Sequence, residues 1–520
     1  MTIAPQAAGL SRGRAAGLLA GLLSGLFSAL LAGCARDGAV KPASTVVIAH
    51  ETPVLSLDPT FDDAATYSAL SNVFEPLVDY DRQLQVVPAL ASVWRNPDET
   101  TWEFDLREGA TFHDGTAVRA PDVAAALERA RRDPASRVAA AFWSVESVEA
   151  AGAQRVRIRT SRPDALLLHQ MTQVLIARGG TPEEIERTPV GTGPYRVVRW
   201  EKGGTLELAA ARPEALPDAA PRGVRFVTPP GPDATIRALS SGEVDVAAVP
   251  PATVLLRPKP VFRILSEDGL TTQILWIDTR RQPGRTNPFA DVRVRRAVVL
   301  ALDRAEIARQ AVGHATFAAE QAVPRAVFGH DPSLDPIPFD PAAARRLLAE
   351  AGFGRGFSAT LHHRDDAPTA LVARAVAGML SSVGIRLQPS PLPWEELLRR
   401  QSAGDLPLYL MGWVFDSGDA ASFFRDTLAA RSAGLGRANA GFESPLADQL
   451  FDQAASTFEA PLRQALLQRL DRLVQEEVPF VPLYRQPETW GVGPRVSWQP
   501  RPDGRLLAVE MALGSGRPAK

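Results

Sequence analysis

The sequence predicts a mixed α/β protein with more than one hydrophobic core. The chain has 520 residues, so two domains, or one large domain with an insertion, are expected. Hydrophobic residues make up 45% and charged residues 22%, as in globular proteins. Strand-like and helix-like patterns alternate without a short repeat, and this order implies sheets covered by helices.

The overall charge argues against a nucleic-acid partner. The formal net charge is −2 at pH 7. Proteins that bind nucleic acid carry a basic surface that neutralises phosphates. We therefore expect no nucleic-acid binding.

Residues 1–33 have the pattern of a bacterial lipoprotein signal peptide. Arg12 and Arg14 precede an apolar stretch at 15–32, and the sequence LAGC follows and ends in Cys34. A basic region, an apolar region and a small-residue processing site are typical of a signal peptide. LAGC resembles a lipobox, in which the cysteine is acylated and becomes the first residue of the mature protein. A signal anchor is the alternative, because the apolar stretch is nearly long enough to span a bilayer.

An acylated Cys34 would place the mature protein on a membrane at the periplasmic or extracytoplasmic face. Residues 34–44 are small, polar or charged and are predicted to be a tether. Cys34 is the only cysteine, so no disulfide is expected. No later segment approaches the length and apolarity of a membrane span.

After the tether, the first elements follow from local patterns. Residues 46–49 are predicted to be a strand, and 101–115 alternates like two strands around a turn at Glu108 and Gly109. Residues 120–132 have the proline entry and apolar spacing of a helix.

The glycine-rich segment 191–210 is predicted to be a hairpin folded at Gly203 and Gly204. It is not a dinucleotide-binding motif, because Arg196 stands where the third glycine is needed.

Two helices are predicted in the second half of the chain. Residues 339–352 have Asp340 at the N-cap, Pro341 at the first helical position and Gly352 past the end. Residues 371–384 form another helical pattern, and the strand-like sequence IRLQ follows it.

Sequence motifs for catalysis or metal binding are missing. The seven histidines show no i, i+4 zinc spacing, and no nucleophile elbow, phosphate-binding loop or EF-hand loop occurs. His362 and His363 are adjacent on a predicted strand, so their side chains should point to opposite faces. We expect one buried and one surface histidine and no shared metal. The sequence thus predicts no enzyme, no catalytic residue, no metal and no cofactor, although a hydrolase with scattered catalytic residues stays open.

The segment YLMGWVFDSGDAASFF, residues 409–424, begins like a buried strand and then places a carboxylate, Asp416, after it. A carboxylate at that position is either a turn or helix cap, or a charge directed at a ligand in a cleft.

A set of short segments resembles the dipeptide- and oligopeptide-binding proteins of bacterial ABC importers, which form extracellular solute-binding protein family 5. The resemblance covers almost the whole chain after the tether. The segments occur in the family's order and at about its spacing: SLDPT (56–60), NVFEPLVDYD (72–81), PALASVW (88–94), TWEFDLREGATFHDGTAVRAPDV (101–123), GTGPY (191–195), LSSGEVDVA (239–247), FADVRVRRAVVLALDRAEI (289–307), ARRLLAEAG (344–352), LMGW (410–413) and VPFVPLY (478–484).

The resemblance implies a two-lobed α/β fold of the periplasmic-binding-protein type, class II, with an extra subdomain in the first lobe and two crossover hinge strands. Lobe I is expected at 45–267 plus 489–516 and lobe II at 268–488. The crossings are expected near 267–269 and 487–488. The implied function is capture of short peptides between the lobes and delivery to ABC permease subunits, by a monomer.

The resemblance also implies ligand-binding residues in the segment Gly412, Trp413, Val414, Phe415 and Asp416. In peptide binders of the family, backbone groups at the positions of Gly412 and Val414 pair with an extended peptide as an added strand. The acid at the position of Asp416 receives the peptide's α-ammonium. A structural role for Asp416 in the turn DSGD is the alternative.

Arg364 aligns with the arginine that binds the free carboxylate in dipeptide-specific members, a role that suits a guanidinium fork. The spacing from Arg364 to Asp416 is one residue short, and Asp365 or Asp366 can pair with Arg364 instead. A surface ion pair is therefore an equal alternative for Arg364. For the whole protein, the alternatives are the same fold with another solute, such as a nickel chelate, haem, a sugar or an opine, and an extracellular hydrolase.

Overall fold

A computed structural model describes residues 43–61, 63–251, 259–281, 286–314, 317–428 and 441–514. The chain divides into two units, 1–42 and 43–520, and the described residues all belong to the second. Cys34 and the predicted signal peptide lie outside the described residues. None of the described helices is long and apolar enough to cross a membrane.

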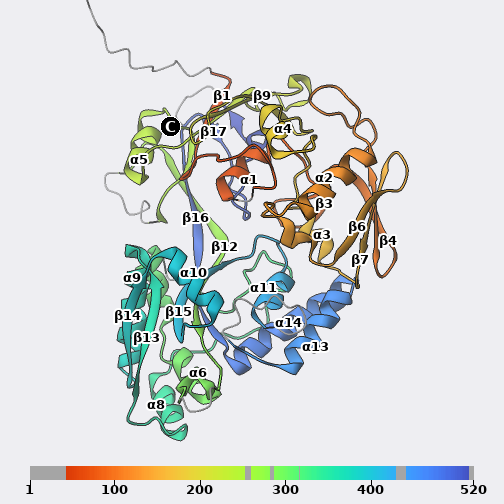
Figure 1. The fold of residues 1–520 in the computed structure, drawn as a ribbon. Helices are drawn as coiled ribbons and strands as arrows, with labels where there is room; N and C mark the ends of the chain where they lie inside the picture. Colours follow the sequence, from red (N-terminus) through yellow and green to blue (C-terminus); the bar gives the residue numbers. More distant parts are fainter. Residues whose placement is uncertain are drawn as a thin grey trace, which may run out of the picture. The chain divides into compact units, whose positions relative to one another are not determined.

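The central feature of the described part of the chain is a ten-stranded mixed sheet (Figure 1). Its two longest strands, β12 (Arg263–Ile277) and β16 (Phe480–Val492), lie side by side in the middle and run from one lobe to the other. The strand order is β14 (Ile385–Leu392), β13 (Phe357–Arg364), β15 (Leu408–Val414), β12, β16, β11 (Val246–Ala248), β1 (Thr45–Ala49), β10 (Gly223–Val227), β9 (Leu206–Ala210) and β8 (Tyr195–Trp200).

Lobe I contains the strands from β11 to β8 and a separate subdomain. In the subdomain the sheet β4-β5-β7-β6 (Ala91–Asp98, Thr101–Leu106, Arg155–Thr160, Val145–Ala150) packs one face on α2 (Ala120–Arg132). Its other elements are the hairpin β2 (Val78–Tyr80) and β3 (Val86–Pro88), with η1 (Ala139–Phe142) and α3 (Leu167–Gln170). The rest of lobe I has α1 (Ala64–Leu70), α4 (Pro182–Arg187), η2 (Pro213–Ala215), α5 (Pro232–Ser241), β17 (Val496–Ser497), η6 (Ala508–Glu510) and β18 (Ala512–Leu513).

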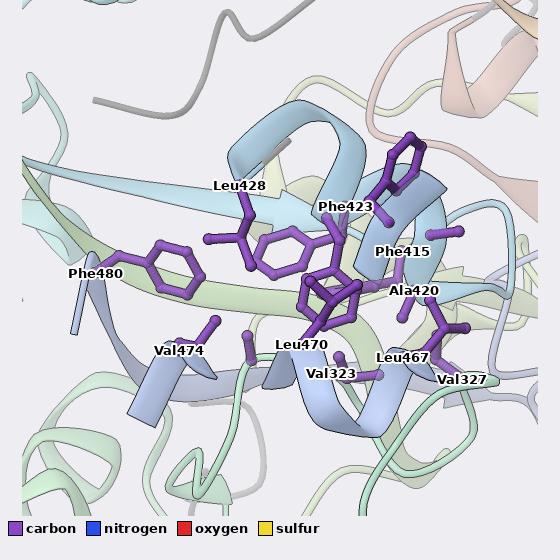
Figure 2. Close-up of a cluster of buried hydrophobic side chains, with 14 of the residues drawn as sticks. Val323, Val327, Phe415, Ala420, Phe423, Leu428, Leu467, Leu470, Val474 and Phe480 are labelled. Atoms are coloured by element: carbon purple, nitrogen blue, oxygen red, sulfur yellow. The ribbon is translucent and has the colours of Figure 1, made fainter. Parts of the chain in front are cut away.

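Lobe II packs helices on both faces of its part of the sheet. Alternate residues of a strand point to opposite faces, so Leu275 and Leu408 enter one core while Trp276 and Tyr409 enter the other. Phe415, Phe423 and Phe480 are in the second core (Figure 2). The helices are η4 (Pro288–Ala290), α6 (Val292–Leu300), α7 (Arg304–Val312), α8 (Pro341–Glu350), α9 (Ala367–Ser381), α10 (Trp394–Ala403), α11 (Ala420–Thr427), α13 (Pro445–Ser456) and α14 (Ala460–Glu477).

Most local predictions are confirmed. The predicted strand at 46–49 is β1, the helix at 120–132 is α2, and the hairpin at 191–210 is β8 with β9. α8 begins at Pro341, and the Asp340 carboxylate accepts a hydrogen bond from the Ala343 amide, as expected for an N-cap.

Two local predictions are corrected. In 101–115 only the first arm is a strand, β5, and the second arm makes an isolated bridge between Thr111 and Ala117. Alternation on both sides of a turn is therefore insufficient to predict a second strand here, because β5 already pairs with β4 and β7. α9 begins at Ala367 instead of 371, because Asp366 caps it.

The two residue groups predicted for the crossings are direct neighbours. Glu267 is in register with Glu488, and Asp268 with Pro487. The register then shifts between Asp268 and Thr271, which is a β-bulge at Gly269 and Leu270. The lobe boundaries drawn from these crossings stay a prediction.

The lobes also share a hydrophobic core away from the crossovers. Tyr80, Leu84 and Leu166 of lobe I belong to the same buried cluster as Phe415 and Phe423 of lobe II. The amide of Ala165 donates to the carbonyl of Ala455 at 2.8 Å across the same contact. Separating the lobes at this place would expose these apolar side chains to water.

The bulge leads to a stability prediction for Gly269. A Cβ atom built at Gly269 would lie 2.3 Å from the carbonyl oxygen of Gln486 on the facing strand. Because this contact is with backbone, Gly269→Ala should lower the free energy of unfolding by about 1–3 kcal/mol. Urea unfolding measures the change.

The matched control is Gly378→Ala. Gly378 lies inside α9, and a Cβ atom there would meet no heavy atom within 4 Å. Alanine should stabilise a helix at this position by about 0.5–1 kcal/mol. Equal effects of the two substitutions would contradict a steric role for Gly269.

A second prediction concerns the buried carboxyl of Asp471 on α14. Asp471 is 1% exposed, and the backbone of Ala322 is the group that its carboxyl meets with hydrogen-bonding character. Burial, and then the charge of Asp331, raise the pKa of Asp471 to about 8. The native state thus binds this proton more tightly than the unfolded chain does. Its stabilising effect is complete below pH about 4 and is lost as the pH rises to about 8.

Asp471→Asn should therefore raise the free energy of unfolding by about 2 kcal/mol at pH 9 and change it little at pH 4, because asparagine stays neutral. Unfolding at both pH values measures the difference. Asp452→Asn on the neighbouring helix α13 is the control, since Asp452 is exposed. A gain that is the same at pH 4 and pH 9 would contradict the titration of Asp471.

Candidate functional site

The outer edge of β15 is the main feature of the candidate site. β15 pairs antiparallel with β12 along its inner edge, with Gln273 opposite Gly412 and Thr271 opposite Val414. The amide of Phe415 donates to the carbonyl of Leu270 at 2.9 Å and continues this ladder. Backbone groups of an antiparallel strand alternate in direction.

It follows that Trp413 and Phe415 direct their backbone groups to β12, whereas Gly412 and Val414 direct theirs to the outer edge. Among the described residues, β15 joins β13 through a single pair, His362 with Tyr409. The described residues give the outer backbone groups of Gly412 and Val414 no ladder partner. The outer edge from Gly412 to Val414 therefore has the geometry that pairing with an additional strand requires.

Side chains divide in the same alternating way. Val414 is 53% exposed, and a Cβ atom at Gly412 would lie 2.8 Å from Nε2 of Gln273 on the same face. Trp413 and Phe415 point to the opposite face, where both rings pack on Phe423. Phe415 is fully buried, and its carbonyl accepts a hydrogen bond from the Gly418 amide at 3.1 Å. Phe415 thus supports the turn, and its role at the ligand stays a prediction.

Asp416 is exposed and is the first residue of the turn that leads from β15 to α11. Gly418 in this turn has a φ of +61°, a conformation that favours glycine. The helix cap is Asp419, whose carboxylate accepts from the Ala421 amide at 2.7 Å. Asp416 therefore does not cap α11.

Asp419 is buried and paired. Its Oδ1 accepts from Nη2 of Arg463 at 3.0 Å, and its Oδ2 lies 3.4 Å from Nε2 of His169. Burial alone would raise the pKa of Asp419, but the charges of Arg463 and His169 outweigh burial and lower it. Asp419 therefore stays ionised as part of a fixed network beneath the turn.

Arg364 lies at the end of β13, which is parallel to β15. Its guanidinium is 58% exposed, and its Nε is 3.4 Å from the Asp366 carboxylate. It also lies 5.5 Å from the ring centroid of Trp394, which is 43% exposed. The predicted pairing with Asp366 is thus confirmed, and the ligand role of Arg364 stays a prediction.

Trp394 was missed by sequence reasoning. It begins α10 immediately after β14, at the same edge of the sheet as Arg364. An exposed tryptophan directly after a strand is a usable sequence signal for a binding residue. Only the pairing of β13 with β14, however, places Trp394 beside Arg364.

The histidine prediction is corrected. His362 and His363 are both buried, at 6% and 3% exposure, because helices cover both faces of lobe II's sheet. No group of three or more His, Cys, Asp or Glu side chains in the described ranges is arranged to hold a metal ion.

The arrangement provides an open strand edge, a carboxylate at its end and a cation with an aromatic ring at the neighbouring strand end. These groups match the chemistry of an extended molecule with a polar backbone and charged ends. Fold and site together define a two-lobed solute-binding protein.

Comparisons with known proteins agree with this class of protein. Residues 85–434 match the family described as "Bacterial extracellular solute-binding proteins, family 5 Middle", and the chain belongs to this family. The di/tripeptide-binding protein 2 of Pseudomonas aeruginosa is 27% identical over 82% of this chain and 85% of its own length. The heme-binding protein A of Haemophilus influenzae is 25% identical over 84% of this chain and 85% of its own length.

A solved structure shows the same fold. The structure of HbpA2 from Haemophilus parasuis matches with a TM-score of 0.79 at 21% identity and covers 90% of this chain and 99% of that chain. The predicted two-lobed α/β fold is confirmed.

Proposed function

We propose that the protein is the substrate-binding component of an ABC importer and captures short peptides between its lobes for delivery to the permease. The observation that carries the proposal is the outer edge of β15, whose backbone groups have no ladder partner among the described residues and which is followed by the carboxylate of Asp416. The similarity to a di/tripeptide-binding protein supports it.

The peptide binds as an added strand. Backbone groups of Gly412 and Val414 pair with its backbone, which gives affinity without dependence on its side chains. On this face Val414 is exposed, whereas the Gln273 side chain lies over Gly412. A receptor that uses backbone pairing tolerates many peptide sequences.

Asp416 receives the α-ammonium of the peptide. It lies directly past the end of the strand edge, where the first residue of an added strand would be. A charge-assisted hydrogen bond to an ammonium is worth about 1.5–3 kcal/mol. Trp413, whose ring packs on Phe423, holds the strand in place from the other face.

Arg364 binds the carboxylate at the other end, and Trp394 packs against the adjoining side chain. The Arg364 guanidinium is exposed and is shared with Asp366 at 3.4 Å, so a ligand carboxylate has to compete with that acid. Arg364 therefore contributes less to affinity than it would without Asp366.

The second candidate ligand is haem. The similarity to a heme-binding protein favours it. Titration of the purified protein with trialanine and, separately, with haemin decides between the two. Binding of trialanine at micromolar concentration supports the peptide proposal, and binding of haemin alone overturns it.

We further propose that Cys34 carries a lipid anchor, that residues 34–44 are the tether, and that the protein acts as a monomer at the extracytoplasmic face of a membrane. The lobes, at 45–267 plus 489–516 and at 268–488, close on the ligand by rotation about β12 and β16. The bulge at Gly269 is a place where the paired strands can bend.

Asp416→Asn tests amine recognition. Asparagine keeps the size of the side chain but removes its charge, so affinity for trialanine should fall by about 2–4 kcal/mol, while N-acetyltrialanine should lose much less. Calorimetric titration measures both. Asp405→Asn, at the other end of β15, is the matched control and should change neither affinity.

If Asp416 serves only the turn, the results differ. Asn is itself a good turn residue, so binding would be unchanged, and Asp416→Ala would lower folding stability by about 1 kcal/mol. Equal losses for the free and the acetylated peptide would remove Asp416 from the binding site.

Cys34→Ser tests the anchor. The variant should keep its fold and peptide affinity but lose membrane association, because acyl chains supply the binding free energy at about 0.8 kcal/mol per buried methylene. Detergent phase partitioning of wild type and variant measures this. A variant that still partitions with the membrane after signal cleavage would contradict the lipoprotein assignment.

A further inference from the structure

The turn that carries Asp416 is held from the other lobe. Tyr80, the last residue of β2 in lobe I, donates a hydrogen bond from its hydroxyl to the carbonyl of Ser417. Its ring lies against Gly418, where a Cβ atom would come within 2.9 Å of the Tyr80 Cζ. The contact therefore involves the two residues that directly follow Asp416.

Within lobe II, backbone hydrogen bonds hold the same turn at Gly418, one residue after Ser417. The Phe328 amide donates to the Gly418 carbonyl at 3.0 Å, and the Ala420 amide donates to the Phe328 carbonyl at 2.9 Å. Lobe II thus anchors the end of the turn, whereas the Ser417 carbonyl is engaged by Tyr80. His169 of lobe I lies beside Tyr80 and also interacts with the Ser417 backbone.

Burial and the neighbouring charged groups favour the role of the Tyr80 hydroxyl as a hydrogen-bond donor. Tyr80 is 6% exposed and packs in the core shared by both lobes. His169 Nδ1 is 2.9 Å from its hydroxyl oxygen. Burial, followed by the charge of Asp419 and with a smaller effect of Asp416, raises the pKa of Tyr80, so the hydroxyl keeps its proton and acts as a donor. Asp416 is thus within electrostatic reach of this hydroxyl.

We propose that Tyr80 is a positioning residue for the ligand: by fixing the Ser417 carbonyl it places the Asp416 carboxylate for the peptide's amine, so amine recognition requires contact between the lobes. This inference rests on the proposed function. Its physical basis is that the Ser417 carbonyl belongs to the peptide unit between Ser417 and Gly418, directly after Asp416 in a short turn. A hydrogen bond that fixes this unit restricts the backbone from which the Asp416 side chain extends. When lobe I moves away, the donor is lost and the turn loses this restraint.

A double-mutant cycle tests the coupling. Tyr80→Phe removes only the hydroxyl and is combined with Asp416→Asn. Tyr195→Phe is the matched control, because Tyr195 is a buried tyrosine whose hydroxyl also donates to a backbone carbonyl, that of Pro221 at 2.9 Å, but within lobe I. The probes are trialanine and N-acetyltrialanine, titrated calorimetrically into the full chain.

Loss of one hydrogen bond predicts that Tyr80→Phe weakens trialanine binding about three- to tenfold, while Tyr195→Phe changes it less than about twofold. N-acetyltrialanine should be nearly insensitive to Tyr80→Phe. In the Asp416→Asn background, Tyr80→Phe should weaken trialanine binding less than about twofold further, because the carboxylate that it positions is gone.

Additive losses in the cycle, equal losses for both peptides, or no loss from Tyr80→Phe would overturn the inference and leave the proposed function standing. If Asp416→Asn alone leaves trialanine binding unchanged, the proposed role of Asp416 fails, and the inference fails with it. Amide hydrogen exchange of Gly418 without ligand gives a second readout, in which Tyr80→Phe should increase exchange and Tyr195→Phe should not. Unchanged exchange would count against the contact.

Discussion

The antiparallel pairing of β12 with β16 is the constraint on which the rest of the structure depends. These strands form the middle of the ten-stranded sheet, so every other strand is placed by pairing outward from them. β15 pairs with β12, and this leaves its outer edge toward β13. Because the same two strands pass through both lobes, the position of the candidate site and the proposed closure of the lobes have one structural origin.

Along β15, which pairs with β12, the alternation of side chains between the two faces of the sheet separates supporting side chains from accessible ones. Along four consecutive residues, Gly412 and Val414 face the open edge and the exposed side, while Trp413 and Phe415 face the core. The turn that follows is built on a buried ion pair, Asp419 with Arg463, which is paired and hydrogen-bonded as a buried charge requires. A rigid support below an exposed carboxylate is what a pre-organised binding group needs.

Much of this could be predicted from the sequence, and the failures have physical reasons. The cap of α8 at Asp340 and the hairpin β8 with β9 depend on neighbouring residues, so local patterns were sufficient. The strand predicted after Gly109 did not form, because its partner β5 is already paired on both edges. His363 was expected at the surface, but helices cover both faces of lobe II's sheet.

The sequence by itself determined the family, the strand that ends shortly before Asp416 and the residues of the turn that follows, because these are encoded in motifs and in short-range spacing. The tertiary structure alone decided which edge of β15 is open, that Trp394 lies beside Arg364, and that Tyr80 contacts the Asp416 turn. Tyr80 and Ser417 are far apart in the chain, and no local pattern encodes a contact that forms only when two separately folded lobes pack together.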